Sequence, residues 1–379
     1  MKLRTLIAAA SIAALGAGMA YADGGKVKVG MITTLSGGGA GLGIDMRDGF
    51  VLAAKGNENL ELVIEDDQRK PDVAVQLTDK LIQSEKVDVL TGIIWSNLAM
   101  AVVPAATAQG KFYLSPNAGP SALAGKGCSP LYFNVAWQND AFYEAGGLWA
   151  SENGIEKVFL MAPNYPAGTD GMTGFKRTFN GEVVGEVYTK LGQTDYAAEI
   201  AQIRASDADT VYFFLPGGMG ISFMKQFAGS GVDKNVMGPA FSFDQGILGA
   251  IGDAALGVKN TSHWSKDIDN AANKKFVADF QAEYGRLPSL YAAQGYDTAL
   301  LLLSAMGKAD VADAAAFQAA LEEADFASVR GDFAFAPNHH PIQDIYMREV
   351  VKEGDVVTNK IVGVASRGHQ DVYGADCKM

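Results

Sequence analysis

Small polar residues, glycines and aromatics follow the predicted strands of this chain, and their placement suits the binding of a small molecule. In a parallel α/β sheet, ligands bind beyond the carboxyl ends of the strands, where such loops meet. Ser96 and Gly119 each lie near a predicted helix start, where free N–H groups can hold a carboxylate without a countercharge. Trp95, Tyr165 and Phe241 can supply apolar walls. The candidate ligand-binding residues are Leu42, Trp95, Ser96, Asn97, Asn117, Ala118, Gly119, Asn164, Tyr165, Pro216, Gly217, Ala240 and Phe241.

Catalytic chemistry finds little support in the same sequence. There is no G-x-S-x-G turn of the kind that one class of serine hydrolases needs. His263, His339, His340 and His369 stand in no H-E-x-x-H motif and at no metal-ligand spacing with carboxylates. Residues 65–67 (Glu-Asp-Asp) end a predicted strand, and we interpret them as a turn with solvated charge. We predict no catalytic residue and no metal site.

The glycine-rich loop at residues 36–43 also needs a test for cofactor binding. Such a loop lets the backbone approach a ligand closely. However, it does not satisfy the dinucleotide fingerprint G-x-G-x-x-G, because Gly39 and Gly41 are followed by Ile44 where the third glycine is required. No Walker motif is present. We therefore predict no cofactor.

The elements that must position these loops alternate between strand and helix. Strands are predicted at 27–35, 60–65, 87–92 and 111–115, with helices at 44–55, 72–84 and 97–109. A second series has strands at 157–162, 183–189, 210–215 and 236–240, with helices at 141–153, 171–179, 196–205 and 220–229. Repeated βα units favour parallel sheets with helices on both faces. The fold class is therefore α/β, with two doubly wound units.

The third portion of the chain breaks this rhythm. Three helices are predicted at 271–284, 289–306 and 313–324, followed by strands at 333–335, 345–352 and 356–362. Helices without strands cannot build a third sheet, so we expect them to complete the first unit and the last strands to complete the second. Lobe I would comprise 23–137 plus 267–336, and lobe II 138–262 plus 341–379. The chain would cross between them near 136–139, 262–266 and 336–341.

The first 22 residues have the pattern of an export signal. Lys2 and Arg4 precede an apolar run that ends in residues 20–22 (Ala-Tyr-Ala), a small-x-small cleavage pattern. Removing residues 1–22 takes away two basic and no acidic residues, so the net charge changes from -12 to -14. This charge disfavours nucleic acid or an anionic membrane as the partner. We expect a soluble exported protein without a transmembrane segment.

The two cysteines, Cys128 and Cys377, fit an oxidising compartment. They can form one long-range disulfide, or they can be two reduced structural thiols; sequence alone does not give the geometry that decides between these. Neither cysteine lies in a C-x-x-C motif, which disfavours metal or redox chemistry.

An ordered set of short motifs covers nearly the whole chain after residue 22, and with it the sequence resembles the type I periplasmic solute-binding proteins of the branched-chain amino acid (Leu/Ile/Val-binding) family. The resemblance implies two lobes, three crossings, hinge closure on one small ligand in the periplasm, and delivery to the permease subunits of an ABC importer; we expect a monomer. The matching segments are residues 27–30 with the glycine-rich loop, residues 66–68 with the segment as far as Pro71, residues 81–82 and 87–88, residues 113–116, residues 164–170 with the helix residues 174–176 that follow them, and residues 295–297.

The resemblance also implies roles for particular residues. The ligand carboxylate would be held by the loop of Ser96 and by residues 117–119, with Leu42 over the ligand and Tyr165 as the aromatic of the second lobe. Amino-acid binders of the family carry a glutamate directly after a Gly-Pro pair, where it pairs with the α-ammonium. Here Gly238-Pro239 is followed by Ala240, and Gly119 stands where the family has a threonine.

This departure has a physical consequence for the ligand. A buried ammonium without a carboxylate partner costs several kcal/mol. We therefore expect a carboxylate without an ammonium, and the aromatic walls favour an aromatic or aryl-alkenoic acid such as a benzoate or hydroxycinnamate. Asp244 could substitute as an ammonium partner or could cap the helix that follows it. Branched-chain or other amino acids, aliphatic acids, and amide or urea-type ligands stay open as alternatives. A ligand-sensing module for a receptor and, from another class, a periplasmic enzyme that uses the same cleft also stay open.

Overall fold

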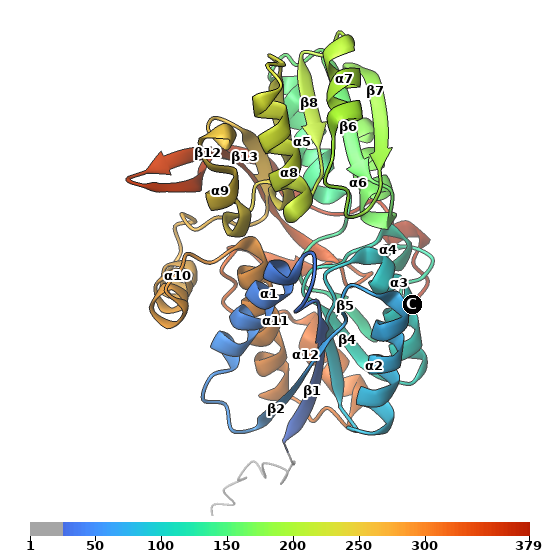
Figure 1. The fold of residues 1–379 in the computed structure, drawn as a ribbon. Coiled ribbons are helices and arrows are strands. Elements are labelled where there is room, and N and C mark those ends of the chain that lie inside the picture. The colour runs from blue at the N-terminus through green and yellow to red at the C-terminus, as the bar shows by residue number, and fades with distance from the viewer. Residues whose placement is uncertain (1–25) are drawn as a thin grey trace, which may run out of the picture.

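The first strand shows how the sequence builds the core. β1 (Val27–Thr33) is a near-continuous apolar run, and Val29, Met31 and Ile32 are fully buried in it, as expected for a parallel strand covered on both faces. The computed structural model describes residues 26–379 and has two α/β lobes (Figure 1). The predicted signal peptide, residues 1–22, lies outside the described residues.

Lobe I contains a five-stranded parallel sheet in the order β2-β1-β3-β4-β5. The strands after β1 are β2 (Leu60–Asp66), β3 (Val89–Gly92), β4 (Phe112–Ser115) and β5 (Tyr132–Asn134). The helices between them are α1 (Ala40–Ala54), α2 (Pro71–Gln83), α3 (Ser96–Ala108) and the short α4 (Ser121–Ala124). Because the strands are parallel, the loops that precede α1 and α3 open at the same edge of the sheet.

Three helices from the third portion of the chain complete lobe I. They are α10 (Ala271–Tyr284), α11 (Leu290–Met306) and α12 (Ala314–Glu322). Leu301, Leu302 and Phe317 from α11 and α12 share one hydrophobic core with Val29 and Phe112 of the sheet. Burial of this kind is the main force that holds a helix against a sheet.

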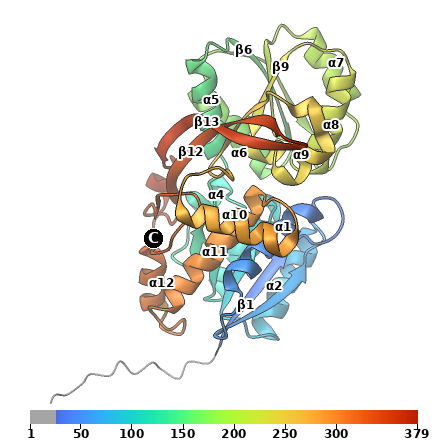
Figure 2. The same cartoon turned by 90° about the vertical axis from the view of Figure 1, so that its left-hand side faces the viewer.

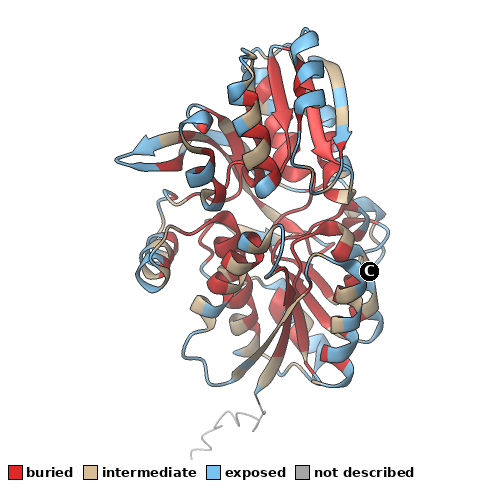
Figure 3. Cartoon of the chain, in the orientation of Figure 1, coloured by how far each residue is buried: buried red, intermediate tan, exposed pale blue. Residues whose placement is uncertain are grey.

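Lobe II contains an eight-stranded mixed sheet. Seven strands follow the order β11-β12-β10-β9-β8-β6-β7, and the eighth, β13, pairs with β12. The parallel strands are β6 (Lys157–Pro163), β7 (Glu182–Thr189), β8 (Thr210–Phe213), β9 (Asn235–Pro239) and β10 (Lys259–Ser262). The helices are α5 (Ala141–Glu152), α6 (Pro166–Thr178), α7 (Ala197–Ala205), α8 (Gly218–Gly229) and α9 (Gln245–Ile251). In both lobes the strands are largely buried, whereas the outer helix surfaces are exposed (Figure 3).

The last strands close lobe II. β11 (Phe333–Phe335), the long β12 (Pro341–Glu353) and β13 (Val356–His369) are antiparallel, and β12 pairs with β10 (Figure 2). The fold class predicted from the sequence is confirmed; the residue boundaries given there for the lobes and crossings stay predictions.

Buried arginines hold the segments that join the lobes. Arg330 donates to the carbonyl oxygens of Val135 and Ala136 at 2.7 and 3.0 Å and forms an ion pair with Asp297 of α11 at 2.7 Å. Burial lowers the pKa of Arg330, but the Asp297 carboxylate opposes this shift. A cation buried this deeply is tolerated only when it is paired and hydrogen-bonded, so the first crossing is fixed to a helix of lobe I.

Two further features concern sequence interpretations. Cys128 and Cys377 form a disulfide with a Cα–Cα distance of 5.6 Å, which joins the C-terminal segment after β13 to the loop after α4. The interpretation of residues 65–67 as a turn with solvated charge is wrong for Asp67, which is fully buried. Its Oδ1 accepts hydrogen bonds from Thr34 Oγ1 at 2.6 Å and from the Arg69 backbone N–H at 2.7 Å. Its Oδ2 has no partner within residues 26–379, and burial raises the pKa of this carboxyl group.

Candidate functional site

An enclosed space lies between the two lobes, at the carboxyl ends of the parallel strands. Its empty volume is about 280 Å³. Lobe I contributes the first turn of α1, the loop before α3 with the first residue of that helix, the loop after β4 and the start of α11, while lobe II contributes the loops after β6, β8 and β9. The lining residues are Leu42, Ile94, Trp95, Ser96, Asn117, Trp137, Tyr165, Ala167, Phe214, Pro216, Phe241 and Tyr291. We call this space the interlobe cavity.

The lobe I side of the interlobe cavity is rich in hydrogen-bonding groups. α3 begins at Ser96, so the first N–H groups of a long helix open beside the cavity without intrahelical partners. The Ser96 hydroxyl accepts a hydrogen bond from Asn139 Nδ2 at 3.3 Å. Asn117 Nδ2 donates to the Ile94 carbonyl at 2.7 Å, which fixes the orientation of its amide. This side can therefore stabilise a negatively charged group.

Two buried polar atoms of the cavity residues have no hydrogen-bond partner within residues 26–379. They are Trp137 Nε1, a donor, and Asn117 Oδ1, an acceptor. Buried polar groups are satisfied in most proteins, because an unpaired one costs about 1–3 kcal/mol. A ligand with both acceptor and donor atoms is one way to satisfy them.

Aromatic rings make up most of the remaining wall. Trp95 of lobe I faces Tyr165 of lobe II, with ring centroids 6.3 Å apart. Trp137, on the first connection between the lobes, lies 4.3 Å from Phe241, and Phe241 lies 5.9 Å from Tyr291 of α11. Gly39 permits the placement of Trp95, because a Cβ atom there would lie 2.5 Å from the indole ring. Such walls provide a flat apolar slot between the lobes.

Within residues 26–379, no charged side chain lines the interlobe cavity. Asp244, the candidate ammonium partner, is instead the N-cap of α9, where it accepts from Gly246 N at 3.1 Å. Its other oxygen accepts from the backbone N–H of Leu290 in lobe I at 2.9 Å. Burial raises the pKa of Asp244 to about 6. This carboxylate therefore joins the lobes beside the cavity rather than facing into it.

Asp170 makes a similar link on α6. Its Oδ2 accepts from the Ser121 backbone N–H at 3.0 Å and from Asn139 Nδ2 at 2.8 Å. Burial raises the pKa of this carboxyl group too. Both carboxylates come from lobe II and accept hydrogen bonds from backbone N–H groups at helix starts in lobe I, where the helix dipole favours negative charge.

Comparison with known proteins identifies the family. Periplasmic binding proteins match residues 26–355 of the chain. The chain belongs to the periplasmic binding protein family. Leu/Ile/Val-binding protein homolog 6 of Brucella melitensis biotype 1 is 30% identical over 372 residues, which cover 92% of this chain and 93% of the relative.

Two solved structures of periplasmic binding proteins are also similar. One is an ABC transporter solute-binding protein from R. palustris in complex with benzoate, with 34% identity, a TM-score of 0.88, and coverage of 94% of this chain and 100% of that chain. Another, from Rhodopseudomonas palustris BisB5 in complex with 3,4-dihydroxy benzoic acid, has 31% identity, a TM-score of 0.83, and coverage of 92% and 99%. This chain is thus an ABC transporter solute-binding protein and not an enzyme. None of its helices within residues 26–379 has the length and apolar character needed to cross a membrane.

The structure brings together about half of the residues that the sequence nominates for the site of this periplasmic binding protein. Those that line the interlobe cavity are Leu42, Trp95, Ser96, Asn117, Tyr165, Pro216 and Phe241. Those that do not are Asn97, Ala118, Gly119, Asn164, Gly217 and Ala240. Asn164 is exposed, Gly217 lines a neighbouring groove between the lobes, and Ala240 is fully buried in a short 3-10 helix, Ala240–Ser242.

Gly119 has a structural role instead. A Cβ atom at this position would lie 2.0 Å from the Trp137 carbonyl oxygen and 2.4 Å from Asn134 Nδ2. The absence of a side chain thus lets the backbone of the first crossing approach the loop after β4. The same approach places the Trp137 indole at the cavity wall.

Several residues of the cavity were not predicted from the sequence. Trp137 lies in a segment interpreted only as a crossing, and Tyr291 is in the first turn of a helix interpreted as packing for lobe I. Phe214 comes directly after β8, so the rule that places ligands beyond strand ends could have found it. The other two missed residues are Ile94 and Ala167.

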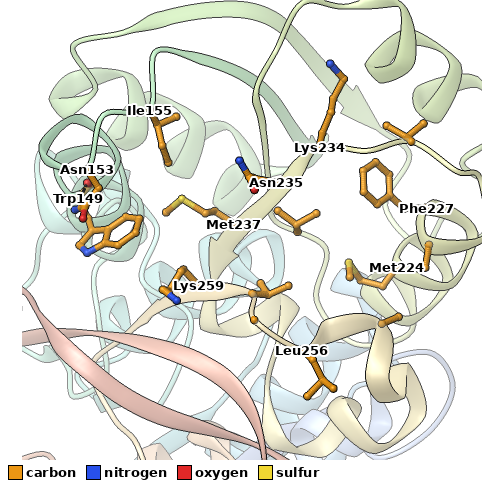
Figure 4. A pocket seen from close by; sticks show the side chains of 16 residues that line it. Trp149, Asn153, Ile155, Met224, Phe227, Lys234, Asn235, Met237, Leu256 and Lys259 are labelled. Carbon is orange, nitrogen blue, oxygen red and sulfur yellow. Dashed lines mark hydrogen bonds between the residues drawn. The ribbon is translucent and has the colours of Figure 1, made fainter.

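A larger recess lies elsewhere on lobe II, away from the interlobe cavity (Figure 4). This outer groove has an empty volume of about 1160 Å³ and is lined by α5, α8, β9 and the start of β10. Trp149, Met224, Phe227 and Leu256 form its apolar surface. All its lining residues come from one lobe, so hinge motion would not close it over a ligand.

Proposed function

We propose that this protein captures a small aromatic carboxylate in the interlobe cavity by hinge closure and presents it to the permease subunits of an ABC importer. One observation carries the proposal: six aromatic residues and no acidic side chain line the cavity. An amino acid would have to leave its α-ammonium without a counterion there, at a cost of several kcal/mol.

The amide-rich side of the cavity supports the carboxylate part of the proposal. The start of α3 offers N–H groups to an anion, and Trp137 Nε1 is a further donor without a partner in residues 26–379. Hydrogen bonds to a charged acceptor are stronger than neutral ones. The carboxylate is thus stabilised by dipoles, without the desolvation of a second buried charge.

The walls support a flat aromatic ligand. Six rings line a narrow space between the lobes, so a planar ring can insert between them as the lobes close. The similar proteins from R. palustris are in complex with benzoate and with 3,4-dihydroxy benzoic acid, which supports the same ligand class.

Hinge closure explains why the walls come from two lobes. Trp95 and Tyr165 face each other across the lobes, and Asp170 and Asp244 form hydrogen bonds between them. A ligand that contacts both lobes favours the closed state by its differential contacts. We further propose that residues 1–22 direct export to the periplasm, where the monomer works.

Thermal unfolding and calorimetric titration of the purified protein test the ligand class. Benzoate and 4-hydroxybenzoate should bind with affinities near 1 μM, about -8 kcal/mol, and at a hundred times Kd should stabilise the fold by about 2.7 kcal/mol. Benzamide, which has the same ring without the charge, is the matched control and should bind more weakly.

The same experiment tests amino acids, aliphatic acids and urea-type ligands. Leucine, isoleucine, acetate and urea should give no stabilisation at the same concentrations. Binding of leucine but not of benzoate would replace the proposal with a branched-chain amino-acid binder. Preference for benzamide over benzoate would point to an amide ligand.

A further inference from the structure

Arg69 covers the outer side of the aromatic wall. Its guanidinium carbon lies 5.3 Å from the centroid of the Trp95 ring, close enough for a cation–π contact. Trp95 is only 1% exposed and lines the interlobe cavity, whereas Arg69 is half-buried. The guanidinium therefore lies between the ring of Trp95 and solvent. Nothing in the sequence analysis pointed to this residue.

A hydrogen-bond network fixes Arg69 in this position. The residue has φ 59°, in the left-handed region that side chains rarely adopt, and its N–H donates to the buried Asp67 carboxylate at 2.7 Å. The same carboxylate oxygen accepts from Thr34 Oγ1, which in turn accepts from Trp95 Nε1 at 3.0 Å. Arg69 and the wall that it covers are thus held by one buried carboxylate.

The other side of the guanidinium contacts lobe II. A Cβ atom at Gly192, in the turn after β7, would lie 2.9 Å from Arg69 Nη2. On lobe I, a Cβ atom at Gly38 of the glycine-rich loop would lie 3.4 Å from Nη1. The arginine thus fills a gap between two glycine turns, one in each lobe. Its contact with Gly192 requires that the lobes are together.

Arg69 has no ionic partner within residues 26–379, unlike two other arginines near the cleft and the crossings. Arg286 pairs with Asp45 and Asp48, and Arg330 pairs with Asp297. The chain as a whole has a net charge of -12, so its long-range field repels an anion. The Arg69 guanidinium is a positive charge at the cleft edge that an approaching anion can pair with.

We propose that Arg69 is an interlobe gate for anionic ligands, which draws a carboxylate to the cleft and then seals the Trp95 wall against Gly192 of lobe II. This inference rests on the proposed function, because it assigns a role toward a negatively charged ligand. The first part acts on the association rate and the second on the dissociation rate. Arg69 touches the wall rather than the cavity, so it is a positioning residue.

Stopped-flow tryptophan fluorescence with 4-hydroxybenzoate tests the charge. Arg69→Gln should lower the association rate several-fold at low salt, and the difference should vanish at 0.5 M NaCl because exposed charges are then screened. Arg69→Lys keeps the charge and should keep the association rate. Arg204→Gln is the control: it removes an equal charge from the end of α7 and should change the rate by less than twofold.

The glycine turn tests the seal. Gly192→Ala places a Cβ atom against the guanidinium and should raise the dissociation rate about fivefold, as should Arg69→Lys. Gly231→Ala is the matched control. Gly231 is also in lobe II and also has a positive φ, 71° against 89° at Gly192, but there is open space around its Cβ position. The Gly231→Ala variant should therefore have similar backbone strain but an unchanged dissociation rate.

Two outcomes would overturn the gate. If Arg69→Gln and Arg204→Gln behave alike at low salt, Arg69 does not draw the anion. If Gly192→Ala and Gly231→Ala release ligand equally fast, Arg69 does not seal the cleft. If the wild-type protein binds no aromatic acid at all, the proposed function fails instead, and circular dichroism of each variant separates either result from misfolding.

Discussion

The interlobe cavity and the outer groove of lobe II both contain aromatic side chains, yet they differ in where their walls come from. The outer groove has the larger empty volume, about 1160 Å³ against 280 Å³. All of its walls belong to lobe II, whereas the walls of the cavity come from both lobes and from the connection that carries Trp137. Between these two recesses, volume alone would favour the one that hinge motion cannot close over a ligand.

The two recesses also treat charge differently. The outer groove includes Lys234 and Lys259, but both ammonium groups already have partners: carbonyl oxygens for Lys234 and Glu349 for Lys259. The cavity has no charged side chain, but it has the start of α3 and an unpaired indole N–H within the described chain. N–H groups that have no hydrogen-bond partner and that a second lobe can enclose therefore indicate an anion site. The presence of a lysine that is already paired does not.

The largest expected effect comes from removing one aromatic ring from each recess. Tyr165→Ala takes away the lobe II ring that faces Trp95 and should weaken benzoate binding by about 2–4 kcal/mol, roughly 30- to 1,000-fold, as for buried aromatic contacts at binding sites. Trp149→Ala removes a half-buried ring from the outer groove and should leave the affinity within twofold. Calorimetric titration measures both, and equal losses would mean that the outer groove takes part in binding.

Sequence patterns predicted the fold more completely than the site. The strands of the two parallel series follow from apolar runs such as Val27–Thr33, whose residues need burial on both faces. β10 was missed because its sequence, Lys-Asn-Thr-Ser, is polar. In the structure, Asn260 and Thr261 are fully buried and hydrogen-bonded to Arg348 and to the Phe142 carbonyl. Only the tertiary partners make this segment a strand.

Cavity residues that directly follow a strand could be predicted from the sequence. Cavity residues that reach the site only because two distant segments meet could not. Ser96 and Phe241 follow strands, so the rule for parallel sheets located them. Trp137 reaches the cavity because Gly119 lets two backbones approach, and Tyr291 does so because α11 begins at the cleft. Arg69 depends on the left-handed backbone held by buried Asp67, which an acidic turn does not reveal.

A smaller effect is expected from the pH dependence of the bond between the lobes at Asp244. Burial raises the pKa of Asp244 to about 6, above the ordinary value of about 3.9. Between these values the folded state binds more protons than the unfolded chain, so this residue's contribution to stability is full below pH 4 and is lost as the pH rises through 6. Compared with Asp244→Asn, which keeps a capping side chain, the wild type should lose on the order of 2 kcal/mol from pH 4 to 7.

Urea unfolding of both proteins at several pH values measures this difference. The Asn variant does not titrate at this position, so all other ionisable groups cancel in the comparison. A difference in unfolding free energy that stays constant from pH 4 to 7 would contradict the assignment.

The smallest effect is expected at the outer groove. Lys259 pairs with Glu349 at 2.6 Å, and both side chains are about one-third exposed, with values of 30% and 32%. Pairs of this kind contribute roughly 0–1 kcal/mol, because water and salt screen them. Lys259→Met should therefore change the unfolding free energy by less than about 1 kcal/mol and should not change benzoate affinity. A titration that shows two benzoate sites in the wild type and one in this variant would make the groove a second anion site. A single site that is unchanged in the variant means that Lys259, which is paired with Glu349, offers no charge to a ligand. Arg69 at the cleft differs in this respect, because it has no ionic partner within residues 26–379.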